Sequence, residues 1–118
     1  MEPLAVHHVS INVDDVDAAL AFYTDVMGFT VRGDRPDFGF GGAWLDVGGQ
    51  QVHLIEAPVP NDAGQHFAVQ VADIEATVTE LRAHGLTVSD AKPVATNLQA
   101  FLHDPAGNTI ELHQVGAA

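Results

Sequence analysis

Four residues of this 118-residue chain could together bind a metal ion: His8, His53, His66 and Glu111. Three imidazoles and one carboxylate suit a divalent first-row transition metal better than calcium or magnesium. Taken singly, a strand histidine is more often packed or exposed than a ligand, and Glu111 could be salt-bridged or exposed. Together, however, the four occupy equivalent positions in a repeated sequence, and this favours metal binding.

A repeat with a spacing of 58 residues connects these positions, because His8 corresponds to His66 and His53 corresponds to Glu111. The same spacing separates pairs that should begin helices, form turns or lie in strands: Asp15 and Asp73, Val16 and Ile74, Asp46 and Asp104, Leu54 and Leu112. The chain therefore contains two copies of one structural unit. The candidate ligands belong to the first and last strands of each copy.

Alternating apolar and polar residues predict the strands, and helical spacing of apolar residues predicts one helix in each copy. Asp15 and Asp73 are the expected N-caps of these helices, and Gly28 and Gly85 their expected ends. The expected strands are residues 4–13, 29–32, 43–47 and 51–56 in the first copy, and 66–71, 86–89, 98–103 and 109–113 in the second, with Lys92-Pro93 as a break.

These elements predict an α+β fold of two βαβββ modules. The modules are residues 1–57 and 65–118, joined by a linker at residues 58–64 that is rich in proline, glycine, asparagine and aspartate. We expect them to form a single domain over residues 1–118, because a chain of this length buries one sizeable core.

Glu111 most needs a structural explanation, since an ionised carboxylate is rarely placed between apolar strand neighbours without a partner. Ile110 and Leu112 point to one face of the strand, and Glu111 points to the other. The preceding segment Asp104-Pro105-Ala106-Gly107-Asn108 predicts a tight turn. We therefore expect a hairpin that places Glu111 in register with the three histidines.

The composition excludes several classes of function. Sixteen acidic residues against four basic ones give a net charge of −12, which makes nucleic acid an improbable partner. The absence of cysteine excludes disulfides, thiol nucleophiles and cysteine-based zinc sites. No apolar run approaches the ~20 residues of a membrane span, and the first residues lack the pattern of a signal peptide. We therefore expect a cytoplasmic protein without membrane contact.

The sequence resembles the glyoxalase/bleomycin resistance/dioxygenase superfamily, also called vicinal oxygen chelate (VOC) proteins. The resemblance covers essentially the whole chain and is most specific in residues 7–13 with Asp15, in residues 18–23, in Gly28-Phe29 and in residues 101–112. It implies a cup formed by the curved sheets of paired βαβββ modules, with ligands from the first and last strands of each module.

By this resemblance the metal ligands are His8, His53, His66 and Glu111, and Glu111 is also the catalytic base. The implied cofactor is one divalent transition metal, Ni, Co, Mn, Zn or Fe(II), without an organic cofactor. Glyoxalase I-like members usually carry Glu or Gln where this chain has His53, and other members use only two histidines and a glutamate. His53 is therefore either a fourth ligand or a group outside the ligand set. Many small members are homodimers in which each cup takes one module from each chain.

The resemblance implies different classes of function. In a metalloenzyme the metal would stabilise an enediolate while Glu111 moves a proton next to a carbonyl, as in lactoylglutathione-lyase-like or epimerase-like isomerisation. An Fe(II) extradiol-type dioxygenase also fits a His-His-Glu set. Alternatively, a metal-free bleomycin-resistance-like protein would sequester a cationic drug, which suits the negative charge. A relic site that binds a regulatory ligand is a third possibility. The intact ligand set favours the enzyme.

Further side chains are expected to line the cup and to bind a small-molecule substrate. Ser10, Asn12, Gln70 and Gln99 are candidate polar contacts, and Arg35 and Lys92 are candidate holders of an anionic group. Phe38, Phe40 and Trp44 would form apolar walls or belong to the core. His113 has the strand parity of Glu111 but lies two residues further along, so we expect it at the rim.

Overall fold

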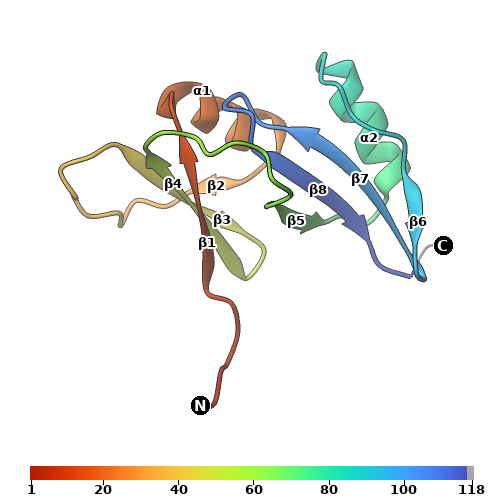
Figure 1. The fold of residues 1–118 in the computed structure, drawn as a ribbon, viewed down its shortest axis with the longest axis horizontal. Coiled ribbons are helices and arrows are strands. Elements are labelled where there is room, and N and C mark those ends of the chain that lie inside the picture. Colours follow the sequence, from red (N-terminus) through yellow and green to blue (C-terminus); the bar gives the residue numbers. More distant parts are fainter. Residues whose placement is uncertain (117–118) are drawn as a thin grey trace. The chain divides into compact units, whose positions relative to one another are not determined.

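The computed structural model describes residues 1–116, which form two compact units: an N-terminal unit, residues 1–60, and a C-terminal unit that begins at Asn61. Each unit contains one four-stranded sheet and one helical segment, in the chain order strand, helix, strand, strand, strand (Figure 1). This confirms the predicted α+β fold with two βαβββ modules. The assignment of both modules to a single domain stays a prediction.

The sheet of the N-terminal unit has the strand order β1-β4-β3-β2. Its strands are β1 (His8–Val13), β4 (Gln50–Glu56), β3 (Gly42–Val47) and β2 (Thr30–Val31). The first and last strands of the module, β1 and β4, pair in parallel, and the other pairs are antiparallel. The helical segment, α1 (Val16–Ala21) followed by one π-helical turn, η1 (Phe22–Val26), packs on β3 and β4.

The C-terminal unit repeats this topology with the strand order β5-β8-β7-β6. Its strands are β5 (Phe67–Gln70), β8 (Thr109–Gln114), β7 (Asn97–His103) and β6 (Lys92–Val94), and α2 (Ile74–Ala83) packs on β7 and β8. Even the register is repeated. Ser10 is aligned with His53 between β1 and β4, and Ala68 is aligned with Glu111 between β5 and β8. The two pairs differ by the same 58 residues that the sequence repeat predicts.

Both helices begin at the predicted aspartates. The side chain of Asp15 accepts a hydrogen bond from the N–H of Ala18 at 3.0 Å, and the side chain of Asp73 accepts one from the N–H of Ala76 at 3.1 Å. Such a cap stabilises a helix by about 1 kcal/mol. Gly85 follows α2 with a φ of +83°, a left-handed conformation that terminates helices and favours glycine.

The helical segment of the N-terminal unit buries a different set of side chains from the predicted stripe. The sequence predicts Val16, Leu20, Tyr23 and Met27 on the buried face, whereas the buried residues are Ala19, Phe22 and Tyr23. The π-helical turn begins at Phe22 and takes more residues per turn than an α-helix, so it displaces only the predicted positions that follow it, such as Met27. In α2, which has no such turn, the predicted stripe of Ile74, Val78 and Leu81 is buried.

One predicted strand is wrong. Residues 86–89 form no strand, and a strand, β6, occurs where the sequence predicts a break at Lys92-Pro93. Only one backbone hydrogen bond, from the N–H of Ser89 to the carbonyl of Phe101 at 3.0 Å, joins the predicted segment to the sheet. Pro93 is tolerated because β6 lies at the sheet edge, where a missing N–H leaves no partner unsatisfied.

The first strand of each module begins later than predicted. β1 starts at His8 rather than at residue 4, and β5 starts at Phe67, so His66 precedes its strand by one residue. The residues before β1 extend away from the rest of the N-terminal unit (Figure 1). The side chains of Met1 and Leu4 are fully exposed. The alternation of apolar and polar residues therefore begins in the sequence before the point at which β1 has a partner strand.

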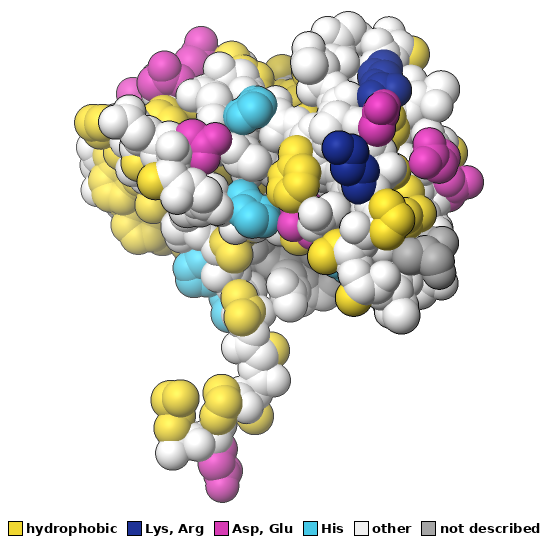
Figure 2. Space-filling model, turned by 45° about the vertical axis from the view of Figure 1, so that its right-hand side comes forward, with side chains coloured by type: hydrophobic (Ala, Val, Ile, Leu, Met, Phe, Trp, Pro, Cys, Tyr) yellow, Lys and Arg dark blue, Asp and Glu magenta, His cyan; other side chains and the backbone are white. Residues whose placement is uncertain are grey.

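The acidic side chains do not gather in one patch on the face that Figure 2 shows, where they are scattered among polar and apolar groups. Among the helices of residues 1–116, none is both long and apolar enough to span a membrane.

Candidate metal and substrate site

The N-terminal unit stacks three rings on one face of its sheet. The ring of His53 lies between those of His8 and Trp44, with centroid distances of 3.9 and 4.5 Å and interplanar angles of 12° and 13°. Trp44 is the cross-strand neighbour of His53, and such neighbours share a face. His8 lies on the same face because it is two residues before Ser10, the β1 neighbour of His53. The two ligands predicted for this unit, His8 and His53, are thus in direct contact.

His53 is kept neutral by its surroundings. Its side chain is buried, with 8% of the residue exposed. Burial, and then the positive charge that His8 can carry, lower the pKa of His53. The Nε2–H group of His53 donates a hydrogen bond to Oε1 of Gln51 at 2.8 Å. Nδ1 is then the nitrogen with a free lone pair, and a neutral imidazole is the form that binds metals.

The site of the C-terminal unit is organised around Glu111, of which 9% is exposed. Its Oε1 lies 3.1 Å from Nε2 of His66, and its Oε2 lies 2.7 Å from Nδ1 of His113. The ring of Phe101 packs edge-on against His66, with a centroid distance of 5.7 Å. The buried carboxylate therefore has an imidazole partner on each oxygen, which compensates for the loss of its water.

A main-chain carbonyl orients His66. Nδ1 of His66 donates a hydrogen bond to the carbonyl of Gly64 at 2.9 Å, so Nε2 of the neutral ring directs a lone pair at Oε1 of Glu111. These two atoms repel each other unless a cation, either a proton or a metal ion, lies between them. Accordingly, the hydrogen bond to Gly64, and then that to Glu111, raise the pKa of His66. The arrangement fits a metal ligand whose outer nitrogen is held by a carbonyl.

A series of hydrogen bonds orients His113. The N–H of Gly116 donates to Oδ1 of Asn97 at 2.7 Å, which turns the amide nitrogen of Asn97 toward Nε2 of His113 at 2.9 Å. Because Nε2 accepts this bond, Nδ1 carries the proton that is donated to Glu111. His113, expected at the rim, lies in direct contact with Glu111, and Asn97 is a further residue of the site that was not predicted. The contact of His113 could have been predicted, because Glu111 and His113 are two residues apart on one strand and so share a face. No sequence signal pointed to Asn97.

The donor set fits a divalent first-row metal ion. His66 and Glu111 present a nitrogen and an oxygen to one point in the C-terminal unit, and His8 and His53 are their repeat equivalents in the N-terminal unit. Within residues 1–116, no three histidine, aspartate or glutamate side chains are grouped so that they could hold a metal ion. The shared site of four ligands therefore stays a prediction.

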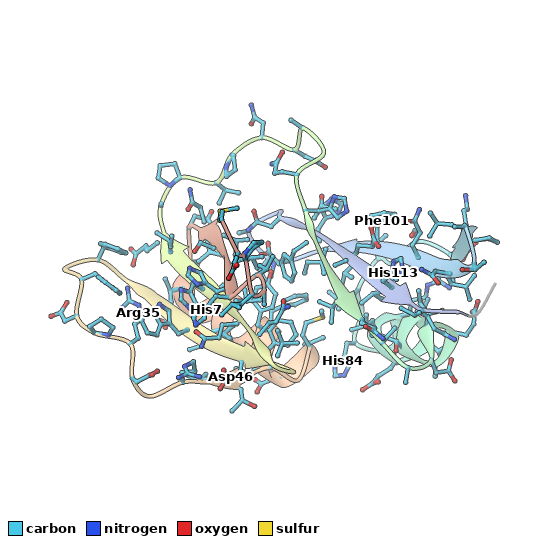
Figure 3. All side chains as sticks on the ribbon, turned by 90° about the horizontal axis from the view of Figure 1, so that it is seen from below. His7, Arg35, Asp46, His84, Phe101 and His113 are labelled. Carbon is cyan, nitrogen blue, oxygen red and sulfur yellow. The ribbon has the colours of Figure 1, made fainter. Side chains whose placement is uncertain are left out.

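Two of the predicted substrate contacts of the N-terminal unit line a pocket of about 520 Å³. They are Ser10 and Arg35, and the pocket wall also contains His7, His8 and His53; His7 and Arg35 are labelled in Figure 3. Asn12 does not line the pocket, because its amide nitrogen donates to the carbonyl of Pro58 at 3.0 Å. This bond ties the end of β1 to the segment that leaves β4.

The remaining predicted substrate contacts form one cross-strand row in the C-terminal unit. Gln70, His113, Gln99 and Lys92 are aligned in this order from β5 through β8 and β7 to β6. The adjacent row, two residues away on the same face, contains Glu111 and Phe101; Figure 3 labels Phe101 and His113. Gln70, Gln99 and Lys92 therefore lie on the same face of the sheet as Glu111, one row further along. His113 lies between Gln70 and Gln99 in that row.

Two βαβββ modules, each with its first and last strands paired in parallel and imidazole or carboxylate groups on or next to those strands, define the vicinal oxygen chelate class of folds. The chain belongs to the Glyoxalase/Bleomycin resistance protein/Dioxygenase superfamily, whose sequence model matches residues 5–112. The expected family is thereby confirmed.

Relatives of known sequence or structure support this assignment. The chain is 31% identical over 124 residues to a probable lactoylglutathione lyase of Synechocystis, with 93% of this chain and 95% of that protein covered. A glyoxalase family protein from Bacillus anthracis has the same fold, with a TM-score of 0.85, 26% identity and 97% of each chain covered. TnmS3, an antibiotic binding protein from Streptomyces, superimposes with a TM-score of 0.83 at 25% identity, covering 97% of this chain and 98% of TnmS3.

Proposed function

We propose that this chain is a divalent-metal-dependent enzyme that moves a proton next to a carbonyl group, in a lactoylglutathione-lyase-like or epimerase-like isomerisation of a small molecule. One observation carries the proposal. Nε2 of His66 and Oε1 of Glu111 face each other at 3.1 Å, while their other polar atoms are held by Gly64 and His113. These two atoms can bind one cation between them, and without a cation their lone pairs repel each other.

The proposed ligands are His66 and Glu111 from the C-terminal unit and His8 and His53 from the N-terminal unit. For all four to hold one ion, a module of each kind must come together, either within a chain or between the chains of a homodimer. The metal, when bound, supplies a Lewis acid that polarises the carbonyl oxygen of the substrate.

Glu111 is the proposed base. It takes a proton from the carbon next to the carbonyl. In an isomerisation this proton returns to the former carbonyl carbon while the hydroxyl proton passes to the former carbonyl oxygen, and in an epimerisation it returns to the opposite face of the same carbon. The hydrogen bond from Nδ1 of His113 to Oε2, at 2.7 Å, holds the carboxylate in place during this transfer. Its burial keeps water from competing for the proton, and this role resembles that of other buried carboxylate bases.

The test begins with metal content. We expect protein purified without chelator to contain one Ni, Co, Mn, Zn or Fe(II) ion per chain, and its hemithioacetal isomerase or epimerase activity to disappear with EDTA and return with metal. Glu111→Gln should abolish activity and weaken metal binding without unfolding the protein. Glu80→Gln, on the exposed side of α2, is the matched control and should change neither. Protein that binds none of these ions would overturn the proposal.

A second candidate function is the sequestration of a small molecule without catalysis. The aromatic pocket of the N-terminal unit favours it, as does the similarity to TnmS3. In that case ligands would bind equally well with and without metal, and Glu111→Gln would leave binding unchanged. The metal dependence of binding therefore separates the two functions.

A further inference from the structure

We propose that the pocket of the N-terminal unit binds a planar organic anion, with its flat body against the aromatic wall and its carboxylate or similar group on Arg35. The inference deepens the proposed function, on which it rests for the claim that the bound molecule is the substrate. The site itself stands on the geometry of the N-terminal unit alone. The pocket, of about 520 Å³, has the size of typical small-molecule sites.

Aromatic rings form most of one wall of this pocket. The rings of Phe38 and Phe40 stack with a centroid distance of 5.5 Å and an interplanar angle of 16°, and Phe38 lies 6.1 Å from Trp44. Trp44 in turn stacks on His53. Phe38 and Phe40 are 48% and 50% exposed, so these rings present apolar surface to whatever occupies the pocket. Ring faces favour a flat, conjugated partner over a bulky aliphatic one.

The guanidinium of Arg35 supplies a positive charge on the rim of the same wall. It lies 5.1 Å from the ring centre of Phe38 and 5.7 Å from that of Phe40, and it donates one hydrogen bond to the carbonyl of Phe40 at 3.0 Å. Within residues 1–116 it forms no ion pair with a carboxylate, whereas Arg32 and Arg82 do. The planar guanidinium suits a bidentate contact with a carboxylate.

The other charged groups at the pocket do not neutralise Arg35. Asp34 lines the pocket but is bound to Arg32 at 2.8 Å, and Arg32 also binds Asp46 at 2.9 Å. The hydrogen bond from the Arg32 guanidinium holds the pKa of Asp34 below its usual range, so this carboxylate stays ionised and paired with Arg32. Glu56 packs against Gly41 and does not line the pocket.

The backbone beneath Arg35 is adapted to this position. A Cβ atom added to Gly42 would lie 3.0 Å from Nη2 of Arg35 and would also collide with the carbonyl of Leu54. The missing side chain therefore gives the guanidinium room to lie along the start of β3 beside the rings. A cationic ligand would have to displace Arg35 from those rings, which argues for an anionic one.

The experiment is isothermal titration calorimetry on the metal-free full chain, so that its result does not depend on the metal. The probe is naphthalene-2-carboxylate. Naphthalene-2-carboxamide keeps the ring without the charge, and cyclohexanecarboxylate keeps the charge without the plane. We expect the naphthoate to bind about tenfold more tightly than either, the increment of one charge-assisted hydrogen bond or one ring contact.

Two variants locate the binding. Arg35→Met keeps an apolar stem of similar length and should weaken naphthoate binding about tenfold while leaving the carboxamide unaffected. Phe38→Leu should weaken both aromatic probes about threefold to tenfold. Arg82→Met, in the C-terminal unit, removes an equal charge and should change nothing. Thermal unfolding curves verify that each variant is folded.

Equal binding of the carboxylate and the carboxamide, or tighter binding of naphthalene-2-methylammonium, would overturn the inference. If metal binds as proposed but naphthoate does not, only this inference fails. If naphthoate binds as described and none of the metals does, the proposed enzyme fails and the pocket remains an anion-binding site.

Discussion

His113 donates a hydrogen bond from Nδ1 to Oε2 of Glu111 at 2.7 Å, across two residues of the same strand. Asn97 determines which ring nitrogen is the donor, because its amide N–H group donates a hydrogen bond to Nε2 of His113 and leaves the ring proton on Nδ1. His113 is therefore a positioning residue for the proposed ligand and base.

The first prediction follows from this bond. His113→Leu should weaken metal binding or lower turnover about tenfold to a hundredfold, because Oε2 loses its donor and the carboxylate can rotate. His113→Asn, which keeps an N–H donor near the position of Nδ1, should restore part of the loss. Metal titration and steady-state kinetics measure both effects. His84→Leu, at the exposed end of α2, is the control, and an equal loss in that variant would contradict the assignment.

The second prediction concerns pH and His66. In metal-free protein we expect the pKa of His66 to lie above its ordinary value of about 6.5, because Gly64 and then Glu111 favour the protonated ring. A raised folded-state pKa gives stability that is fully present below the unfolded-state pKa and is lost as pH rises through the folded-state pKa. Side-chain NMR titration gives the pKa directly, and Glu111→Gln should remove only part of the shift.

Denaturation of the metal-free protein provides the complementary measurement. The difference in the free energy of unfolding between the natural chain and His66→Gln should shrink as the pH rises from the unfolded-state pKa of about 6.5 through the higher folded-state pKa. A difference that grows with pH over this interval would mean that His66 is neutral and that the hydrogen-bond assignment is incorrect.

The third prediction compares two glycines. Gly42→Ala should destabilise the protein by about 2–4 kcal/mol, because the added methyl group collides with the main-chain carbonyl of Leu54 in the neighbouring strand. Gly33→Ala meets nothing within 4 Å and should be neutral or slightly stabilising. Urea denaturation of both variants is the measurement. Similar free energies of unfolding would show that β3 and β4 can separate at this point without cost.

The fourth prediction compares two aspartates at equivalent positions of the repeat. Asp104 is 4% exposed, and its Oδ1 accepts hydrogen bonds from the N–H groups of Ala106 and Asn108, both at 2.9 Å. Asp104→Ala should cost about 2–3 kcal/mol, since these two part-buried N–H groups lose their acceptor. Asp46 pairs with part-exposed Arg32 near the surface, so Asp46→Ala should cost less than about 1 kcal/mol. A larger loss from Asp46→Ala would contradict this ranking.

Local signals made the fold predictable. Asp15 and Asp73 cap their helices as expected, and the stripe of α2 is buried as expected, because caps and periodicity act within a few residues. Residues 86–89 show where such signals end. Their composition suits a strand, but a strand also needs a partner, and β7 pairs instead with Lys92–Val94 despite its proline.

The site was predictable only as far as the repeat extends. The repeat relates His53 to Glu111, and the identical registers of β1 with β4 and of β5 with β8 explain why this comparison works. The role of Asn97 depends on the position of Gly116, which fixes the amide orientation. No periodicity encodes that contact. The pocket around Arg35 likewise depends on the path of an irregular loop.

The repeated register also bears on how this protein can change over evolutionary time. Both modules place their last-strand residue at the same point of the same scaffold, yet His53 joins a stack of rings while Glu111 joins a network of ionisable groups. The same backbone position therefore carries a different kind of contact in each module. The side chain at that position, rather than the strand that holds it, sets what each module can contribute to a site.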